Sequence, residues 1–223
     1  MPTKKVGRPA KIDREQLLDV AEKLFSESGF DGTTIRQLAK AAHCNLALIS
    51  YYFGGKEGLY EGVLLRHLQG LRDRYSRAQN EAEENREELR KSWPEFKDPV
   101  QARFCSSIYT IASYIITNRQ IQKILCREMM SGGKRMALAL SKSESGLTGV
   151  LQETLSGLKK SKYIGSDLDT RYGVLSIMGP IVYTCVASPV LKDVYGFKNL
   201  DETYIRNLSV HLTQTLFHGW IQR

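Results

Sequence analysis

The sequence predicts an all-α fold in which a small amino-terminal unit of three helices, two of them forming a helix-turn-helix, precedes a larger helical domain. Apolar residues recur at helical spacing in successive segments of the chain. Helix-capping residues precede two short segments within residues 33–53, and two long apolar segments, about 167–187 and 201–221, follow near the carboxyl end. We therefore expect an arm at 1–11, a helix-turn-helix domain at 12–58 and a larger domain at 59–223.

Composition is that of an ordinary globular protein with a basic surface. The chain has 223 residues, of which 42% are hydrophobic and 25% charged, so it can bury one large or two modest cores. The formal net charge of +8 favours a polyanionic partner, nucleic acid first. A solvated basic surface without a partner is the alternative that charge alone leaves open.

Other features argue against metal, secretory and membrane classes. The four cysteines are scattered and form no C-x-x-C pair, so a zinc ribbon or a thioredoxin-like site is not expected. The first residues contain no apolar segment of the secretory type. The apolar segment 172–187 is shorter than a membrane span and contains Gly179 and Pro180. We expect a reduced, cytoplasmic protein that does not enter a membrane.

Residues 1–11 are basic and carry Lys4, Lys5 and Arg8 without an acidic residue. Gly7 and Pro9 oppose a helix here. Beside a helix-turn-helix, such a segment can act as an arm along phosphates or in a minor groove. A disordered tail that only aids solubility is the alternative.

The first helix is expected to begin after Asp13, with Gln16 completing a capping box, and to end at Gly29. Because its apolar stripe is expected to pack into the core, we interpret this helix as structural support for the helix-turn-helix. The next stretch, 33–56, organises the chain. Thr34 and Gln37 form a second capping box, and Asn45 caps a short helix over 46–53. Two short helices joined by a tight turn form a helix-turn-helix, whose second helix enters a DNA major groove.

Candidate DNA contacts follow from that placement. Hydroxyl and backbone N–H groups at the start of the first motif helix favour phosphate, whereas polar and small apolar groups on the second can read base edges. The second helix has no Arg or Lys, so we expect apolar, hydroxyl and amide contacts, with affinity supplied by Arg36, Lys40 and Lys56 around it. Besides the arm, the candidates are Thr33, Thr34, Arg36, Gln37, Asn45, Leu46, Ala47, Ser50, Tyr51, Tyr52 and Lys56. For Tyr52 core packing is the alternative.

The order T-T-I-R-Q-L-A-K-A-A and then A-L-I-S-Y-Y-F-G-G-K-E-G-L-Y resembles the amino-terminal domain of the tetracycline-repressor (TetR) family over about residues 11–65. Ser50 stands where many members have a tyrosine, so Tyr51 or Ser50 is expected to replace its phosphate contact. The resemblance also implies that Lys56 faces a phosphate. It implies that a helix from about Glu57 into the 70s tilts to set the distance between two reading heads.

Residues 72–98 are highly charged, and we expect an exposed helical extension or a mobile linker anchored by Trp93 and Phe96. Acidic pairs there have no nearby histidine, so no metal is expected. Helices are then expected from Pro99 to about 115, over 120–130, 145–159, 167–187 with a kink at Pro180, and 201–221. The resemblance implies that the last two pair with a second copy. The expected dimer-interface residues are Val174, Ile177, Ile181, Val182, Leu208, Leu212, Thr215, Leu216 and Trp220.

Polar and sulfur-containing groups on the middle helices suit an apolar pocket with a few orienting groups. The resemblance implies a small-molecule effector there, and a core with a polar rim is the alternative. The candidates are Arg103, Tyr109, Tyr114, Arg127, Glu128, Met129, Met178 and Tyr183.

The sequence thus favours a homodimeric repressor that binds a palindromic operator and is released by an effector. The alternative is a small-molecule or redox-sensing binding protein whose helix-turn-helix is only structural. His43, His67, His211 and His218 form no local catalytic or metal-binding pattern, so no enzyme, catalytic residue or cofactor is expected.

Overall fold

The computed structural model describes residues 12–142 and 147–219, and every regular element in these ranges is an α-helix. The helices are α1 Arg14–Ser28, α2 Ile35–Ala41, α3 Leu46–Phe53, α4 Lys56–Glu84, α5 Arg86–Ser92, α6 Pro99–Thr117, α7 Arg119–Met130, α8 Lys134–Lys142, α9 Leu147–Lys160, α10 Thr170–Val186, α11 Ser188–Asp193 and α12 Glu202–His218. None of the described helices is both long and apolar enough to cross a membrane.

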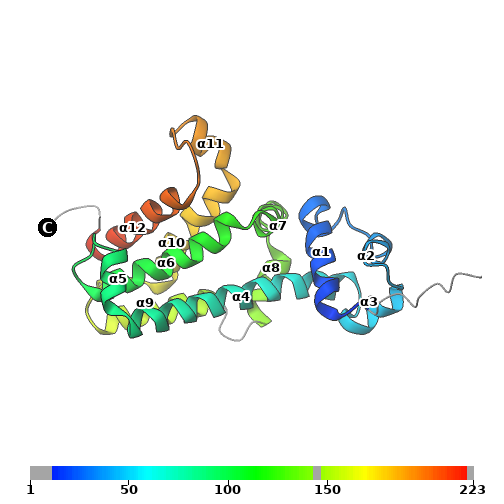
Figure 1. Ribbon diagram of the computed structural model, residues 1–223, viewed down its shortest axis with the longest axis horizontal. Coiled ribbons are helices and arrows are strands. Elements are labelled where there is room, and N and C mark those ends of the chain that lie inside the picture. The colour runs from blue at the N-terminus through cyan, green and yellow to red at the C-terminus, as the bar shows by residue number, and fades with distance from the viewer. Residues whose placement is uncertain (1–11, 143–146, 220–223) are drawn as a thin grey trace, which may run out of the picture.

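Helices α1–α3 form a head at one end of an elongated molecule (Figure 1). The predicted capping boxes, of Asp13 with Gln16 and of Thr34 with Gln37, are both present, and the Asn45 side chain accepts from the backbone N–H of Leu48. Gly29 ends α1 at φ +74°, which glycine adopts without strain. Local sequence therefore determines where each head helix starts and where α1 ends.

The long helix α4 leaves the head and runs beneath the rest of the protein (Figure 1). It continues to Glu84, well beyond the expected end, and α5 follows directly. The charged stretch 72–98 is therefore mostly helical. Trp93 and Phe96 are buried together with Ala82, Leu89 and Cys105, which confirms their predicted anchoring.

Two larger cores hold the molecule together. One lies among α4, α6, α9, α10 and α12 and is built on residues such as Ile108, Ile111 and Leu155. The other fills the head, and Ile124 of α7 with Met136 and Ala139 of α8 belongs to it as well. The head core thus extends past the expected division at residue 58 and includes side chains from α7 and α8.

Candidate nucleic-acid interface and effector cavity

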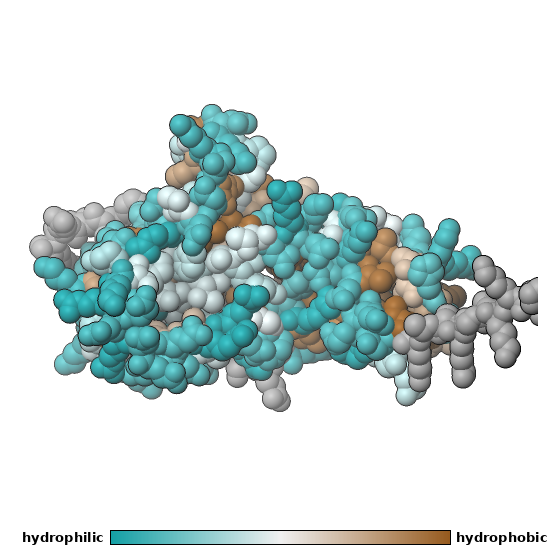
Figure 2. Space-filling model, in the orientation of Figure 1, coloured by the Kyte–Doolittle hydropathy of each residue, from teal (hydrophilic) through white to brown (hydrophobic). Residues whose placement is uncertain are grey.

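One face of α3 is exposed on the head. Leu46 is 42% exposed and Tyr51 81%, and Ala47 and Ser50 are exposed between them. Apolar surface lies over the part of the head where α2 and α3 are found (Figure 2). Ile49 on the opposite face is fully buried, so packing fixes which side of α3 faces outward. Tyr52 is half-buried against the head core, in agreement with the packing alternative.

Some predicted DNA contacts have structural roles instead. Thr33 is buried and its hydroxyl donates to the carbonyl of Gly29 at 2.7 Å. The Lys56 ammonium group donates to the carbonyls of Phe30 and Thr33, both at 3.0 Å, and lies 4.0 Å from the centre of the Phe30 ring. The Thr33 hydroxyl is therefore not on the surface as expected, and the Lys56 ammonium group contacts backbone carbonyls where a phosphate was expected. Both groups stabilise the loop between α1 and α2.

The remaining candidates on the head are exposed. Arg36 and Lys40 are exposed on α2, and Thr34 and Gln37 are exposed although they also cap the helix. Lys4, Lys5 and Arg8 lie outside the described residues.

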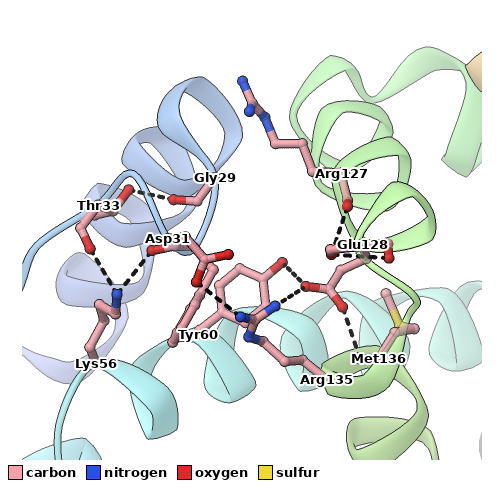
Figure 3. Close-up of polar contacts among 11 residues, drawn as sticks. Gly29, Asp31, Thr33, Lys56, Tyr60, Arg127, Glu128, Arg135 and Met136 are labelled. Atoms are coloured by element: carbon pink, nitrogen blue, oxygen red, sulfur yellow. Dashed lines mark hydrogen bonds and ion pairs between the residues drawn. The ribbon is translucent and has the colours of Figure 1, made fainter.

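The head is joined to the body by a polar cluster around Glu128 (Figure 3). The Glu128 carboxylate is buried, and it accepts from the Tyr60 hydroxyl at 2.9 Å and from the Arg135 guanidinium and the Met136 N–H, each at 3.4 Å. Arg135 also meets Asp31 of the α1–α2 loop at 3.2 Å. Burial, and then the hydrogen bond to Glu128, raise the pKa of Tyr60. The α7–α8 hairpin therefore grips the head through charge as well as packing.

Arginines of the same cluster contact Phe30 in the α1–α2 loop and the carboxyl end of α1. Arg135 lies 4.0 Å from the centre of the Phe30 ring, which also meets Lys56, so Phe30 contacts two cations. Arg127 donates to the carbonyl of Glu27 at 2.7 Å, near the carboxyl end of α1 where a cation is favourable. Arg127 and Glu128 thus face the head and do not line an effector pocket, contrary to expectation.

An apolar cavity of about 310 Å³ lies between α4 and α10, walled by α6, α7 and α8. Tyr114, Met129 and Met178 line it, as expected for an effector site. Its volume is at the lower end of the range for ligand pockets. Among the described residues of its wall, the polar side chains are those of His67 and Tyr114, and none is a Lys, Arg, Asp or Glu.

The other effector candidates lie elsewhere. Arg103 forms an ion pair with Glu83, and the Tyr109 hydroxyl donates to Glu202 at 3.1 Å. Tyr183 is 49% exposed. These three do not line the cavity. Helical spacing could not reveal this, because a residue's distance from the cavity depends on how the helices cross.

Several of the expected dimer-interface residues are buried within the protomer. Val174, Ile177, Ile181 and Leu212 are buried in the protomer's own core, and Val182 lines the cavity. Leu208, Thr215 and Leu216 are half-buried, and Trp220 lies outside the described residues. The exposed apolar side chains of this region are instead Tyr172, Leu175, Tyr183, Val186, Val190, Val194, Tyr195 and Phe197. The nearly uniform hydropathy of α10 hid its orientation.

All four cysteines are free thiols. Burial raises the pKa of Cys44 and Cys126, and it raises the pKa of Cys105 and of Cys185 to about 12. Since the thiolate is the reactive form, none has the lowered pKa of an oxidant sensor. The geometry therefore does not favour the redox-sensing alternative.

Comparison with known proteins agrees with the geometry of the head. The sequence profile of the family described as bacterial regulatory proteins, tetR family, matches residues 17–63, which cover α2, α3 and parts of α1 and α4. Over residues 17–63 this chain is similar to the TetR family.

Curated proteins that are similar to this chain are regulators of transcription by name. The chain is 31% identical over 116 residues to the probable HTH-type transcriptional regulator YttP of Bacillus subtilis, which covers 52% of this chain and 50% of YttP. The chain thus spans about half the length of this curated relative.

Solved structures share the fold over nearly the whole chain. The fatty acid degradation regulator FadR of Bacillus halodurans has a TM-score of 0.66 at 20% identity and covers 96% of this chain and 100% of its own. FadR of Bacillus subtilis, solved in complex with stearoyl-CoA, has a TM-score of 0.68 at 18% identity, with 94% and 100% covered. At such identities the likeness shows the fold.

Proposed function

We propose that this protein is a TetR-family transcriptional repressor that binds a palindromic operator as a homodimer and is released by an apolar effector. The observation that carries the proposal is the exposed face of α3, held outward by the buried Ile49, on a head that carries the exposed cations Arg36 and Lys40. This arrangement suits a helix in a major groove with phosphate contacts beside it. Residues 12–58 and 59–223 are then the reading and regulatory parts of a cytoplasmic protein.

The cavity supports the effector half of the proposal. It lies against α4, which connects the head to the body, and against α7 and α8, which grip the head. A ligand that prefers one arrangement of these helices shifts the balance between them by its differential affinity. The stearoyl-CoA of Bacillus subtilis FadR makes a long acyl chain a reasonable candidate, because the cavity wall is almost entirely apolar.

The exposed apolar face of α10 supports the dimer. Tyr172, Leu175 and Val186 are between 48% and 68% exposed on one helix, and contiguous exposed apolar surface marks association sites. Brown surface also appears at the base of the α10–α11 projection (Figure 2). A two-fold dimer would present two heads to the two halves of a palindrome.

DNA binding is tested by fluorescence anisotropy with duplexes from upstream of the protein's own gene and with a scrambled competitor at two salt concentrations. We expect two protomers per site, resistance to competitor and weaker binding at higher salt. Tyr51→Ala should weaken binding without lowering the melting temperature, whereas the exposed variant Glu153→Gln on α9 should bind as the wild type does. Absence of any competitor-resistant site across the gene's flanking DNA and a randomised duplex pool would contradict the proposal.

A further inference from the structure

The cavity between α4 and α10 is bounded on one side by residues that also face solvent. Met129 of α7 and Leu175 of α10 both line it, although they are 47% and 64% exposed. Gly179, one turn after Leu175, also lines the cavity and is exposed. A residue that borders both a cavity and solvent lies at the edge of that cavity. These three are the exposed residues among the described part of the wall, so the cavity has its mouth between α7 and α10.

The successive faces of α10 explain the position of this mouth. One face packs into the core through Ile177 and Ile181, and the next carries Met178 and Val182, which line the cavity. An exposed face follows on the far side of Leu175. Its large apolar side chains, here called the α10 stripe, are Tyr172, Leu175, Tyr183 and Val186. The α10 stripe therefore begins at the mouth of the cavity.

The α10 stripe is suited to a second copy of this chain. No residue from Tyr172 to Val186 is charged, so two copies that meet there bring no like charges together. In a two-fold dimer the same patch is used by both subunits, and each stripe then lies on the other. A Cβ added at Gly179 would meet no described atom within 4 Å, so the protomer leaves the space beside the mouth open. A partner packed on the stripe also covers the mouth.

The chemistry of the wall fits a hydrocarbon group. The wall is almost entirely apolar, and the Tyr114 hydroxyl and the His67 Nδ1 lie 2.8 Å apart and satisfy each other. An apolar cavity of about 150 Å³ binds benzene. The cavity of this protein, at about 310 Å³, therefore has room for a larger hydrocarbon such as naphthalene.

We infer that the cavity binds a hydrocarbon group and that a second copy of this chain closes its mouth, so that ligand binding and dimer formation strengthen each other. The inference rests on the proposed effector cavity and dimer, and it names how the two are regulated together. Coupling between two binding events is reciprocal, so a partner that raises the affinity for the ligand is itself held more tightly when the ligand is present. Such an effector would release the operator from an intact dimer and would not separate the subunits.

The test uses the full chain without DNA, with naphthalene as the uncharged probe and 2-naphthoate as the charged one. Isothermal titration calorimetry measures affinity, and analytical ultracentrifugation measures the equilibrium between monomer and dimer. Val186→Asp places a charge on the α10 stripe and leaves the cavity wall unchanged, because Val186 does not line it. Leu138→Asp, at an exposed position of α8 outside the wall, is the matched control. Circular dichroism checks that both variants fold.

We expect the wild type and Leu138→Asp to be dimeric and to bind naphthalene equally, and a monomeric Val186→Asp protein to bind it about five- to tenfold more weakly. This factor corresponds to about 40–50 Å² of apolar surface left uncovered at the mouth. With both cavities filled, the dimer dissociation constant of the wild type should fall by about 25- to 100-fold, the square of the effect at one site. The charged 2-naphthoate should bind more weakly than naphthalene, because the described wall contains no cation.

Equal naphthalene affinity in the wild-type dimer and the Val186→Asp monomer would overturn the coupling, as would a dimer dissociation constant that naphthalene leaves unchanged. A Val186→Asp protein that remains dimeric would also overturn it, since the partner would then cover another surface. Failure of naphthalene to bind, or tighter binding of 2-naphthoate, would overturn the ligand class. None of these readouts requires operator DNA, so loss of the repressor proposal would show separately in the anisotropy experiment.

Discussion

The exposed face of α3 carries only uncharged side chains, among them Leu46, Ala47, Ser50 and Tyr51. Guanine is most often recognised by Arg or Lys, whereas small apolar groups meet the methyl group of thymine. At the residue scale, direct recognition by this protein is therefore expected to depend on thymines at the centre of each half-site.

Thymine-to-uracil substitution isolates that methyl group. Each uracil placed opposite Leu46 or Ala47 should weaken binding about fourfold, since one methyl group contributes about 0.8 kcal/mol. Anisotropy titrations measure the change, and uracil between the half-sites serves as control. Leu46→Ala should reduce the uracil effect at its own position. An operator that tolerates uracil everywhere would contradict this mode of reading.

Variants of Lys56 and Lys40 should distinguish an effect on stability from an effect on DNA affinity. Lys56→Ala loses hydrogen bonds to Phe30 and Thr33 and a contact with the Phe30 ring, so the free energy of unfolding should fall by about 1–3 kcal/mol. The exposed Lys40→Ala should leave that free energy nearly unchanged and reduce the salt dependence of DNA binding. Urea unfolding and salt titrations distinguish them, and equal stability of both variants would contradict the role given to Lys56.

Glu22 should make stability depend on acidity. Burial tends to raise its pKa, but contacts with His67 and Arg66 outweigh burial and lower the pKa below its ordinary 4.5. A carboxylate with a lowered folded-state pKa stabilises the fold above pH 4.5, and this contribution is lost as the pH falls through the folded-state value. Urea unfolding between pH 6 and 3 should show the loss. Glu22→Gln should flatten the curve in that window, and an unchanged curve would exclude the role.

At the scale of elements, the α7–α8 hairpin acts as a clamp on the head. Glu128→Gln keeps the shape of the side chain but removes the charge that Arg135 and Tyr60 meet, and we expect the free energy of unfolding to fall by about 1–3 kcal/mol. The exposed Glu153→Gln is the matched control. Chemical unfolding followed by circular dichroism measures both, and two equal curves would show that the clamp depends on packing alone.

Local signals determined much of the fold. The caps at Asp13, Thr34 and Asn45 are local chemistry, so the starts of α1–α3 follow from sequence. Helix α8 was missed because Ser131-Gly132-Gly133 marks an end without marking a new start, and α11 because Pro189 lies just after the expected end of α10.

The cavity and the Glu128 cluster were predictable only in part, because local signals do not show which distant residues come into contact. Tyr114, Met129 and Met178 were found by residue type, but His67, Tyr60 and Arg135 were not among the candidates. Their roles arise from partners 47, 68 and 104 residues away along the chain. Periodicity along a helix does not contain such information. Likewise, nothing in the sequence around Asp31 or Glu128 indicates that both carboxylates pair with the Arg135 guanidinium group.

At the scale of the whole molecule, the exposed face of α10 should control assembly. Val186→Asp places a charge on that face and is expected to convert dimer to monomer in analytical ultracentrifugation while the melting temperature of the protomer changes little. Leu138→Asp, on an exposed position of α8, is the control and should remain dimeric. A dimeric Val186→Asp protein would place the interface elsewhere.

The core of the head contains side chains from distant parts of the chain, and this limits how freely the protein can be recombined. Ile124, Met136 and Ala139 complete the packing around Leu38, Ile49 and Tyr60. A chimera that grafts residues 12–58 onto a foreign regulatory body would leave these partners behind and expose apolar surface. New operator specificity is therefore better introduced by replacing the exposed side chains of α3 in place, and new ligand specificity by changing the α10 wall of the cavity, whose residues do not belong to the head core. In this chain, side chains on one face of a helix can therefore be replaced more safely than a whole domain.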